Sequence, residues 1–185
     1  KTSVDVSVTA TAVSGTFANL NTVYVTNAAN YANLGDENVT ITDTTSAANV
    51  NAILGATSGI VTATVTADTA ANLNAALTNA TGTDALTLTI NDTSLTSVSN
   101  LLALDGKTNV AVNASSVNSI SETIANLNTA YNSTGISGLG NENISITNTG
   151  TITAAQINDL LGETSGTITL VGSGNLAITM TSGQT

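Results

Sequence analysis

Residues 61–77 read VTATVTADTAANLNAAL, and this stretch predicts one strand followed by one short helix. Apolar residues alternate with Thr over Val61–Thr66, which is the period of two expected of a half-buried strand. From Leu73 onward, apolar residues recur at i, i+3 and i+4, which is typical of one face of a helix. Asp68 lies between the two segments, where a helix N-cap is expected.

The same strand–helix unit recurs along the chain. Alternating segments typical of strands lie at Val4–Val8, Val39–Thr42, Val61–Thr66, Leu86–Ile90, Val110–Asn113, Ile144–Thr147 and Thr167–Val171. Helical spacing lies between them, within Val50–Leu54, Leu73–Leu77, Val98–Leu102, Ile120–Leu127 and Ile157–Leu161. Because a crossover between parallel strands is almost always right-handed, we expect successive units to coil the same way. The predicted fold is an α/β solenoid, a right-handed stack of strand–helix repeats in which one parallel sheet is backed by short helices.

A longer duplication is superimposed on these units. The segment ANLNTVY at residues 18–24 returns as ANLNTAY at residues 125–131, an offset of 107 residues. Segments 33–39 and 138–144 match at an offset of 105 residues. We therefore expect residues 1–185 to form a single repeat domain, with a long repeat of about 105–107 residues made of four strand–helix rungs.

The pattern changes near the C-terminus. The strand expected at Thr167–Val171 is followed by Gly-Ser-Gly-Asn and by a second strand-like run at Leu176–Met180. So short a segment cannot form a parallel crossover within one sheet. Residues 167–180 therefore predict a terminal β-hairpin or a joint to a following unit.

The composition argues against several function classes. Of the 185 residues, 41% are hydrophobic, 36 are Thr and 24 are Asn, whereas His, Cys and Pro are absent. Without His, and with Lys1 and Lys107 as the only cations, catalysis has few candidate bases, and we predict that the chain is not an enzyme. A net charge of −10 argues against binding to nucleic acid or to an anionic membrane. No apolar run approaches the roughly 18 residues of a membrane span, so no membrane insertion is expected.

Units such as TADTAANL at residues 66–73 resemble the tandem repeats of giant secreted bacterial cell-surface proteins, including those of cyanobacteria. The resemblance implies an extracellular or cell-surface location and a fibre, surface-layer or adhesive role. Such proteins often carry glycine- and aspartate-rich calcium nonapeptides, but this sequence contains no Gly-Gly-x-Gly-x-Asp run. Calcium loading is therefore not implied for this chain.

The strands expected at the two ends favour self-association. Val4–Val8 and Leu176–Met180 carry Asp5 as their only charge, although exposed sheet edges are usually protected by charges or Pro. A head-to-tail contact that does not close on itself builds filaments. We predict a structural repeat protein that forms or contributes to an extracellular filament, surface layer or cell-surface fibre, as a homopolymer or a tandem array.

An extracellular binding module, such as an adhesin or an ice- or glycan-binding protein, is the alternative function. Hydroxyl side chains are expected on the outward face of successive strands, and Thr-x-Thr arrays of this kind resemble those of ice-binding proteins. The candidate binding face consists of Thr40, Thr42, Thr62, Thr64, Thr87, Thr89, Ser145 and Thr147. Long loops near Tyr24 and Tyr131 are a second candidate surface, with glycan as the ligand. Thr is also simply a good solvent-facing strand residue, and this interpretation stays open.

The acidic residues have structural and metal-binding interpretations. Asp43, Asp68 and Asp92 recur once per unit, which favours helix capping. The weak calcium candidates Asp36, Glu37 and Glu142 lie in the longer loops, where a solvated surface is the alternative. Apart from this possible calcium, no cofactor is expected.

Overall fold

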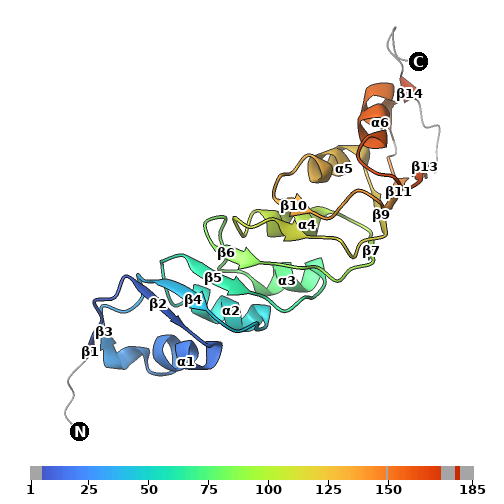
Figure 1. Ribbon diagram of the computed structural model, residues 1–185. Helices are drawn as coiled ribbons and strands as arrows, with labels where there is room; N and C mark the ends of the chain where they lie inside the picture. The colour runs from blue at the N-terminus through green and yellow to red at the C-terminus, as the bar shows by residue number, and fades with distance from the viewer. Residues whose placement is uncertain (1–5, 149, 172–177, 180–185) are drawn as a thin grey trace.

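The structure, a computed structural model, describes residues 6–148, 150–171 and 178–179. It is an elongated α/β protein with parallel strands and short helices, and its two termini lie at opposite ends (Figure 1). The helices are α1 (Phe17–Asn21), α2 (Ala47–Leu54), α3 (Ala70–Ala76), α4 (Ser99–Asp105), α5 (Ile124–Tyr131) and α6 (Ala154–Leu161). A π-helical turn, Thr22–Thr26, and a 3-10 turn, Ala28–Asn30, follow α1.

The strands are short and, within the described residues, every pairing between them is parallel. One sheet has the order β2-β4-β5-β6, a second has the order β13-β11-β9-β7, and three strand pairs are β1-β3, β8-β10 and β12-β14. The strands are β1 (Val6–Ser7), β2 (Ala12–Gly15), β3 (Tyr31–Ala32), β4 (Asn38–Ile41), β5 (Val61–Thr64), β6 (Ala85–Thr87), β7 (Ser94–Leu95), β8 (Val112–Asn113), β9 (Ser119–Glu122), β10 (Ile136–Ser137), β11 (Asn143–Ile146), β12 (Ile152–Thr153), β13 (Ile168–Leu170) and β14 (Ile178–Thr179).

Each strand–helix segment forms two separate parallel β-pairings with the next segment along the chain. The segment that ends in α4 pairs with the segment that ends in α5 through Thr89↔Asn113 and through Ser94↔Ser119. The other neighbouring segments also pair twice, for example through β1-β3 and β2-β4. Inward residues consequently line up across strands, as in the row Val13–Val39–Val61.

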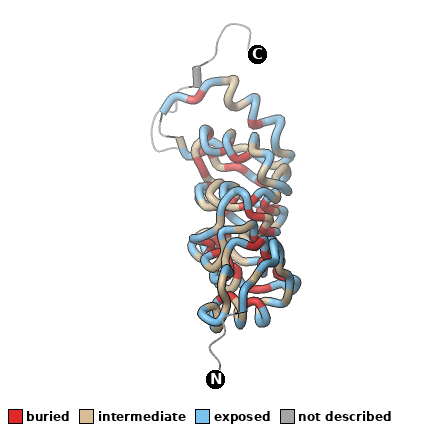
Figure 2. Tube along the Cα trace, turned by 90° about the vertical axis from the view of Figure 1, so that its left-hand side faces the viewer, coloured by how far each residue is buried: buried red, intermediate tan, exposed pale blue. Residues whose placement is uncertain are grey.

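The core is almost entirely aliphatic and runs along the length of the molecule (Figure 2). Strand residues such as Val39 and Ile144 and helix residues such as Leu73, Leu101 and Leu127 are at most 1% exposed. Burying a side chain of this size stabilises the fold by about 1.5–3 kcal/mol relative to exposure. Each short helix therefore contributes its share of a continuous core.

The α/β fold with parallel strands and short helices is confirmed, but two details of the prediction are wrong. Instead of one sheet, the strands are divided among separate sheets and pairs. Ile120 was expected to begin a helix, whereas it lies in β9 and pairs with Leu95 and Ile144. β9 ends at Glu122, Thr123 is the N-cap residue, and α5 begins at Ile124.

The predicted C-terminal hairpin is wrong in its described part. β14 pairs in parallel with β12, the strand directly before α6, and not with its neighbour in sequence, β13. β13 belongs to a four-stranded sheet and β14 to a separate strand pair, so consecutive strands here do not require a parallel crossover within one sheet. The connecting residues 172–177 and residue 180 lie outside the described part of the chain.

Two of the three aspartates expected to cap helices do bind a helix N-terminus, but that of the preceding segment. Asp43 was expected to cap the helix that follows it, whereas its Oδ1 accepts a hydrogen bond of 2.7 Å from the Phe17 backbone N–H at the start of α1. Asp92 Oδ2 accepts from Ala70 N–H of α3 at 2.6 Å in the same way. Asp68 accepts from Thr69 N–H at 2.7 Å, but the N-cap of α3 is Thr69 itself, whose hydroxyl accepts from Asn72 N–H. The contacts of Asp43 and Asp92 satisfy helix N-termini and also tie consecutive segments together.

The matching sequence segments carry matching elements. The order β2, α1, β3, β4, α2, β5 is repeated by β9, α5, β10, β11, α6, β13, with β12 added before α6. The registers are also repeated, because Ala12↔Asn38 in the first part corresponds to Ser119↔Asn143 in the second. The two parts can therefore be compared residue by residue.

Candidate functional site

The hydroxyl side chains of the candidate binding face form short rows that do not extend along the whole molecule. Ser14, Thr40 and Thr62 are in register on β2, β4 and β5, and all three are exposed. The next strand places Ala85 beside Thr62, which ends this row.

The remaining positions fall into other rows. Thr64 aligns with Thr87, and Thr89 aligns with Asn113. Ser145 lies in the second sheet, between Ser121 and Thr169. Thr42 and Thr147 follow β4 and β11, and both are exposed. The structure therefore does not bring the eight residues together into one array.

Two buried carboxylates occupy equivalent turns in the two matching parts. Glu37 and Glu142 are both 0% exposed. Oε2 of Glu37 accepts hydrogen bonds from the Tyr24 hydroxyl at 3.0 Å and from Gly35 N–H at 2.9 Å. Oε2 of Glu142 accepts from the Tyr131 hydroxyl at 2.8 Å and from the backbone N–H of residue 140 at 2.9 Å. We call each of these arrangements a carboxylate turn.

The carboxylate turns also join consecutive segments through their backbone. The carbonyl oxygen of Glu37 accepts a hydrogen bond of 2.7 Å from Thr57 Oγ1, and that of Glu142 accepts one of 2.8 Å from Thr164 Oγ1. Gly35, which donates to Glu37, has a φ of +117°, in the left-handed region that favours glycine. Each turn therefore fixes a long loop against the segment that follows it.

The charge of Glu37 is held inside the protein. Burial alone would raise the pKa of Glu37, but hydrogen bonds from the Gly35 backbone and the Tyr24 hydroxyl outweigh burial and leave that pKa below its usual value. Burial is the largest cause that raises the pKa of Tyr24 far above its usual value. The hydrogen bond from the Tyr24 hydroxyl to Glu37 and the negative charge of Glu37 also raise this pKa. Burial and Glu142 raise the pKa of Tyr131 in the same way. Both tyrosines are therefore hydrogen-bond donors at neutral pH.

The calcium candidates are not assembled into an ion-binding group. Within the described residues, no set of three or more His, Cys, Asp or Glu side chains lies close enough together to hold a metal ion. Asp36 is exposed and borders a cavity of about 210 Å³, while the adjacent Glu37 is buried against Tyr24. At Glu142 the residue corresponding to Asp36 is Asn141, so the pair of acids is not repeated.

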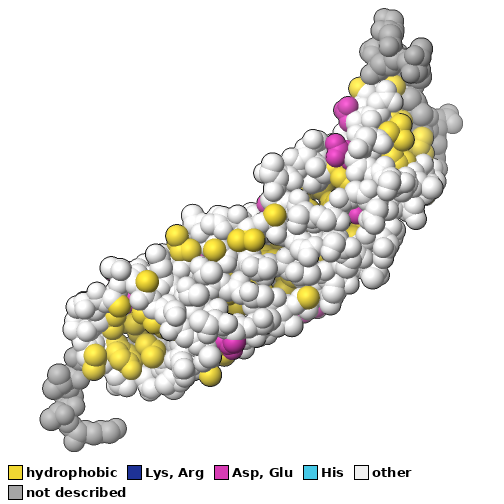
Figure 3. Space-filling model, viewed as in Figure 1, with side chains coloured by type: hydrophobic (Ala, Val, Ile, Leu, Met, Phe, Trp, Pro, Cys, Tyr) yellow, Lys and Arg dark blue, Asp and Glu magenta, His cyan; other side chains and the backbone are white. Residues whose placement is uncertain are grey.

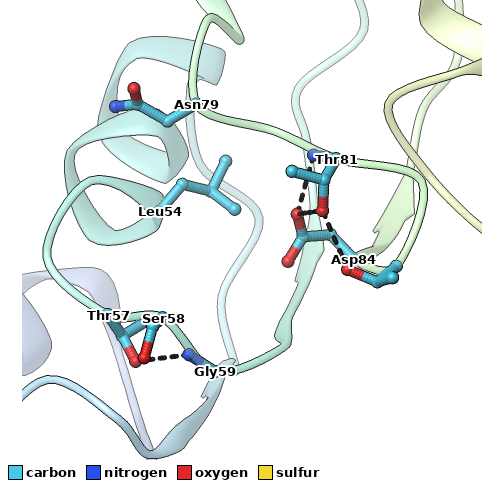
Figure 4. Close-up of a pocket in the computed structure, with 8 residues that line it drawn as sticks. Leu54, Thr57, Ser58, Gly59, Asn79, Thr81 and Asp84 are labelled. Atoms are coloured by element: carbon cyan, nitrogen blue, oxygen red, sulfur yellow. Dashed lines mark hydrogen bonds between the residues drawn. The ribbon is translucent and has the colours of Figure 1, made fainter.

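A small cavity lies between the end of α2 and the loop before β6 (Figure 4). Asp84 is its one charged lining residue, but Oδ2 of Asp84 accepts from Thr81 N–H at 2.9 Å and Oδ1 accepts from Val61 N–H at 2.9 Å. Its volume of about 150 Å³ is below the roughly 300–1,000 Å³ of typical ligand pockets. We therefore interpret the cavity as a gap in the packing between two segments and not as a ligand pocket.

Apolar side chains gather near both ends of the molecule (Figure 3). At the C-terminal end, Leu161 is 58% exposed, while the equivalent Leu54 is 7% exposed. Leu170 is 39% exposed, while the equivalent Ala63 is 3% exposed. The C-terminal end face is defined here as Ile157, Leu161, Ile168 and Leu170.

At the N-terminal end, equivalent residues also differ in exposure, but by less. Val13 and Phe17 are partly exposed, whereas their equivalents Ile120 and Ile124 are each 1% exposed. In the second part of the chain, β7 pairs along β9 and covers this position. The N-terminal end face is defined here as Val13, Phe17 and Val23.

The sequence had indicated open strand edges at the two ends, but neither the carboxylate turns nor the apolar residues of the two end faces. The turns could have been found because a Tyr and a Glu recur together, at offsets of 107 and 105 residues. No protein-family model, curated protein or solved structure matches this chain. In the part of the chain that the structure describes, no helix is both long and apolar enough to span a bilayer.

Proposed function

We propose that this chain is a right-handed α/β solenoid that serves as a structural repeat unit of an extracellular filament, surface layer or cell-surface fibre, assembled end to end. The observation that carries the proposal is the difference in burial between equivalent residues. Leu54 is covered by the segment that follows it, whereas Leu161 occupies the same position at the C-terminal end face and is exposed. The internal duplication thus indicates that the end face is adapted to be covered by a further rung.

The physical chemistry of the two end faces supports open-ended association. The two faces are different surfaces, so a contact between them is head-to-tail, and such contacts extend into filaments unless the rotation closes a ring. The strands at the two ends, β1, β2, β13 and β14, contain none of the charged residues that normally prevent edge-to-edge pairing. Lys107, the one cation of the described residues, is used in an internal contact. Its Nζ donates to the Leu77 carbonyl at 2.6 Å.

The extracellular or cell-surface location rests on composition. The chain is acidic, with a sequence pI of about 4.1, and rich in Thr and Asn. Its lack of His and Cys, and the use of Glu37 and Glu142 as structural groups, support a role that is not enzymatic.

Electron microscopy across a concentration series tests the assembly. We expect filaments for the unmodified chain and their loss in Leu161→Asp, because a charge placed in a desolvated apolar contact is unpaired. Leu161 is 58% exposed, so the substitution should leave folding intact. Ile60→Asp is the matched control, since Ile60 is 43% exposed but lies between two internal elements, α2 and β5.

Monodisperse short rods under every condition would contradict the proposed function. Equal assembly by Leu161→Asp and Ile60→Asp would show that the C-terminal end face is not the contact. A parallel series with a calcium chelator tests whether calcium contributes to the joints.

The alternative function, an extracellular binding module, is supported by the exposed row Ser14–Thr40–Thr62. An ice-recrystallisation assay on the unmodified chain and on Thr40→Val/Thr62→Val tests it. A binding role for the row predicts inhibition that falls at least several-fold in the double variant. The glycan version has less support, because Tyr24 is 3% exposed and its hydroxyl is used by Glu37.

A further inference from the structure

Glu122 is a buried carboxylate that the proposed function does not use. It is the last residue of β9 and is 8% exposed. In the matching first part of the chain the equivalent residue is Gly15, because Glu122 pairs with Ile146 as Gly15 pairs with Ile41. The carboxylate is therefore not part of the duplicated framework, and its contacts are specific to this place in the molecule.

Both carboxylate oxygens of Glu122 accept hydrogen bonds. Oε2 accepts from Ser97 Oγ at 3.0 Å and from Val98 N–H at 3.2 Å, and Oε1 accepts from Thr123 N–H at 2.8 Å. Val98 is the N-cap residue of α4, and its own side chain makes no capping hydrogen bond. Glu122 therefore reaches from β9 to the preceding segment and supplies an acceptor to the start of α4.

The part of the chain that Glu122 holds is Ser94–Val98, which we call the α4 entry. Its first two residues form β7, the last strand of the sheet β13-β11-β9-β7, and pair with Ser119 and Ile120. A cavity of about 140 Å³ is lined in part by residues 94–97. Leu95 is 5% exposed and Val98 is 0% exposed. The α4 entry thus combines a short strand pairing, adjacent free space and apolar side chains that are covered in the closed state.

The ionised state of Glu122 is stabilised by neutral donors. Burial raises the pKa of Glu122, but hydrogen bonds from the Thr123 backbone and the Ser97 hydroxyl outweigh burial and leave that pKa below its usual value. The titratable and charged groups on or next to the elements packed against Glu122 form hydrogen bonds with other partners, and they are Asp92, Asp105, Lys107, Tyr131 and Glu142. The charge of Glu122 is therefore tied to the α4 entry and to the start of α5.

We propose that Glu122 makes the α4 entry an acid-sensitive joint, which is closed while Glu122 is ionised and opens when Glu122 takes up a proton from solvent. A protonated carboxyl group carries a hydrogen on one oxygen, and both oxygens of Glu122 already face donors. Proton uptake therefore breaks at least one hydrogen bond to Ser97, Val98 or Thr123. The opening frees the α4 entry from β9 and exposes its apolar side chains. This inference goes beyond the proposed assembly and does not depend on it.

Hydrogen–deuterium exchange followed by mass spectrometry tests the joint in the unmodified chain. Because folding lowers the pKa of Glu122, the stability gained from its charge is present above the usual glutamate pKa of about 4.3 and is lost as the pH falls through the folded value. Between pH 7 and pH 3.5, protection of the α4 entry, corrected for the intrinsic exchange rate, should fall at least about threefold more than protection of β4 and β5. The fall should be no steeper than about tenfold per pH unit, the limit for uptake of one proton.

Glu122→Gln removes the titration and keeps the size of the side chain. Its NH₂ group cannot accept a hydrogen bond, so at pH 7 the α4 entry of this variant should exchange at least about threefold faster than that of the unmodified chain. The difference between the two chains should narrow at pH 3.5. Glu163→Gln is the matched control, because Glu163 is exposed and the same change of charge there should leave the exchange of the α4 entry unchanged.

Equal loss of protection in the α4 entry and in β4 and β5 would overturn the proposal, because the effect of acid would then be global. This comparison uses the unmodified chain, so it holds even if the variant does not fold. Full protection of the α4 entry in Glu122→Gln at pH 7 would also overturn the proposal, as would an acid response that this variant retains. None of these results bears on the proposed assembly, which electron microscopy measures separately.

Discussion

Glu37→Ala should lower the free energy of unfolding by about 3 kcal/mol, since it removes the acceptor from one buried and one partly buried donor, each of which costs about 1–3 kcal/mol when left unsatisfied. The donors are the hydroxyl of Tyr24, which is 3% exposed, and the backbone N–H of Gly35. Urea denaturation followed by circular dichroism measures the loss. Glu142→Ala should show a similar loss, because its carboxylate turn has the same donors.

Glu37→Gln tests the charge separately from the hydrogen bonds. The amide oxygen of Gln can accept from Tyr24 and Gly35, and its NH₂ group takes the place of Oε1, which is buried and has no hydrogen-bond partner. Because folding lowers the pKa of Glu37, the stability gained from its charge is present above the usual glutamate pKa of about 4.3 and is lost as the pH falls through the folded value. The difference in unfolding free energy between the unmodified chain and Glu37→Gln should therefore shrink with falling pH.

For Glu37→Ala, a loss of unfolding free energy below about 1 kcal/mol would show that the carboxylate turn does not stabilise the fold as proposed.

The repeating units could be predicted because their periods are unambiguous. Over residues 61–77, alternation changes to helical spacing at one point, and the structure places β5 and α3 on the two sides of it. β9 was missed because Ile120 is its only aliphatic residue and lies at helical spacing from Ile124 and Leu127. A strand so short cannot be distinguished from the first turn of a helix by period alone.

The sites were harder to predict, for a different physical reason. Acidic residues in loops are normally solvated, so Glu37 and Glu142 were assigned to the surface or to calcium. Their burial depends on backbone N–H groups and a tyrosine hydroxyl that the loop brings to them, and no local pattern encodes such contacts. The hydroxyl rows failed as one array because register, set by bridges such as Thr62↔Ala85, is a property of strand pairing.

Gly59→Ala and Gly166→Ala should each lower the free energy of unfolding by about 3 kcal/mol, at the upper end of the cost of overpacking. A Cβ atom at residue 59 would overlap the carbonyl oxygen of Glu37, and one at residue 166 would overlap that of Glu142. The obstacle in both cases is backbone that is already held by a Thr hydroxyl, from Thr57 or Thr164, so it cannot move aside without breaking the carboxylate turn.

Gly150→Ala is the matched control for these two substitutions, because a Cβ atom there would meet no atom within 4 Å. We expect it to change the free energy of unfolding by no more than about 0.5 kcal/mol. Thermal and urea unfolding of the three variants provide the comparison. If Gly59→Ala unfolds like Gly150→Ala, the backbone of Glu37 is free to shift, and the close approach of consecutive segments at this turn is not what fixes the long loop. If both tight glycines are sensitive, the paired turns stabilise the two matching parts by the same contact, which is what repetition of one structural unit requires.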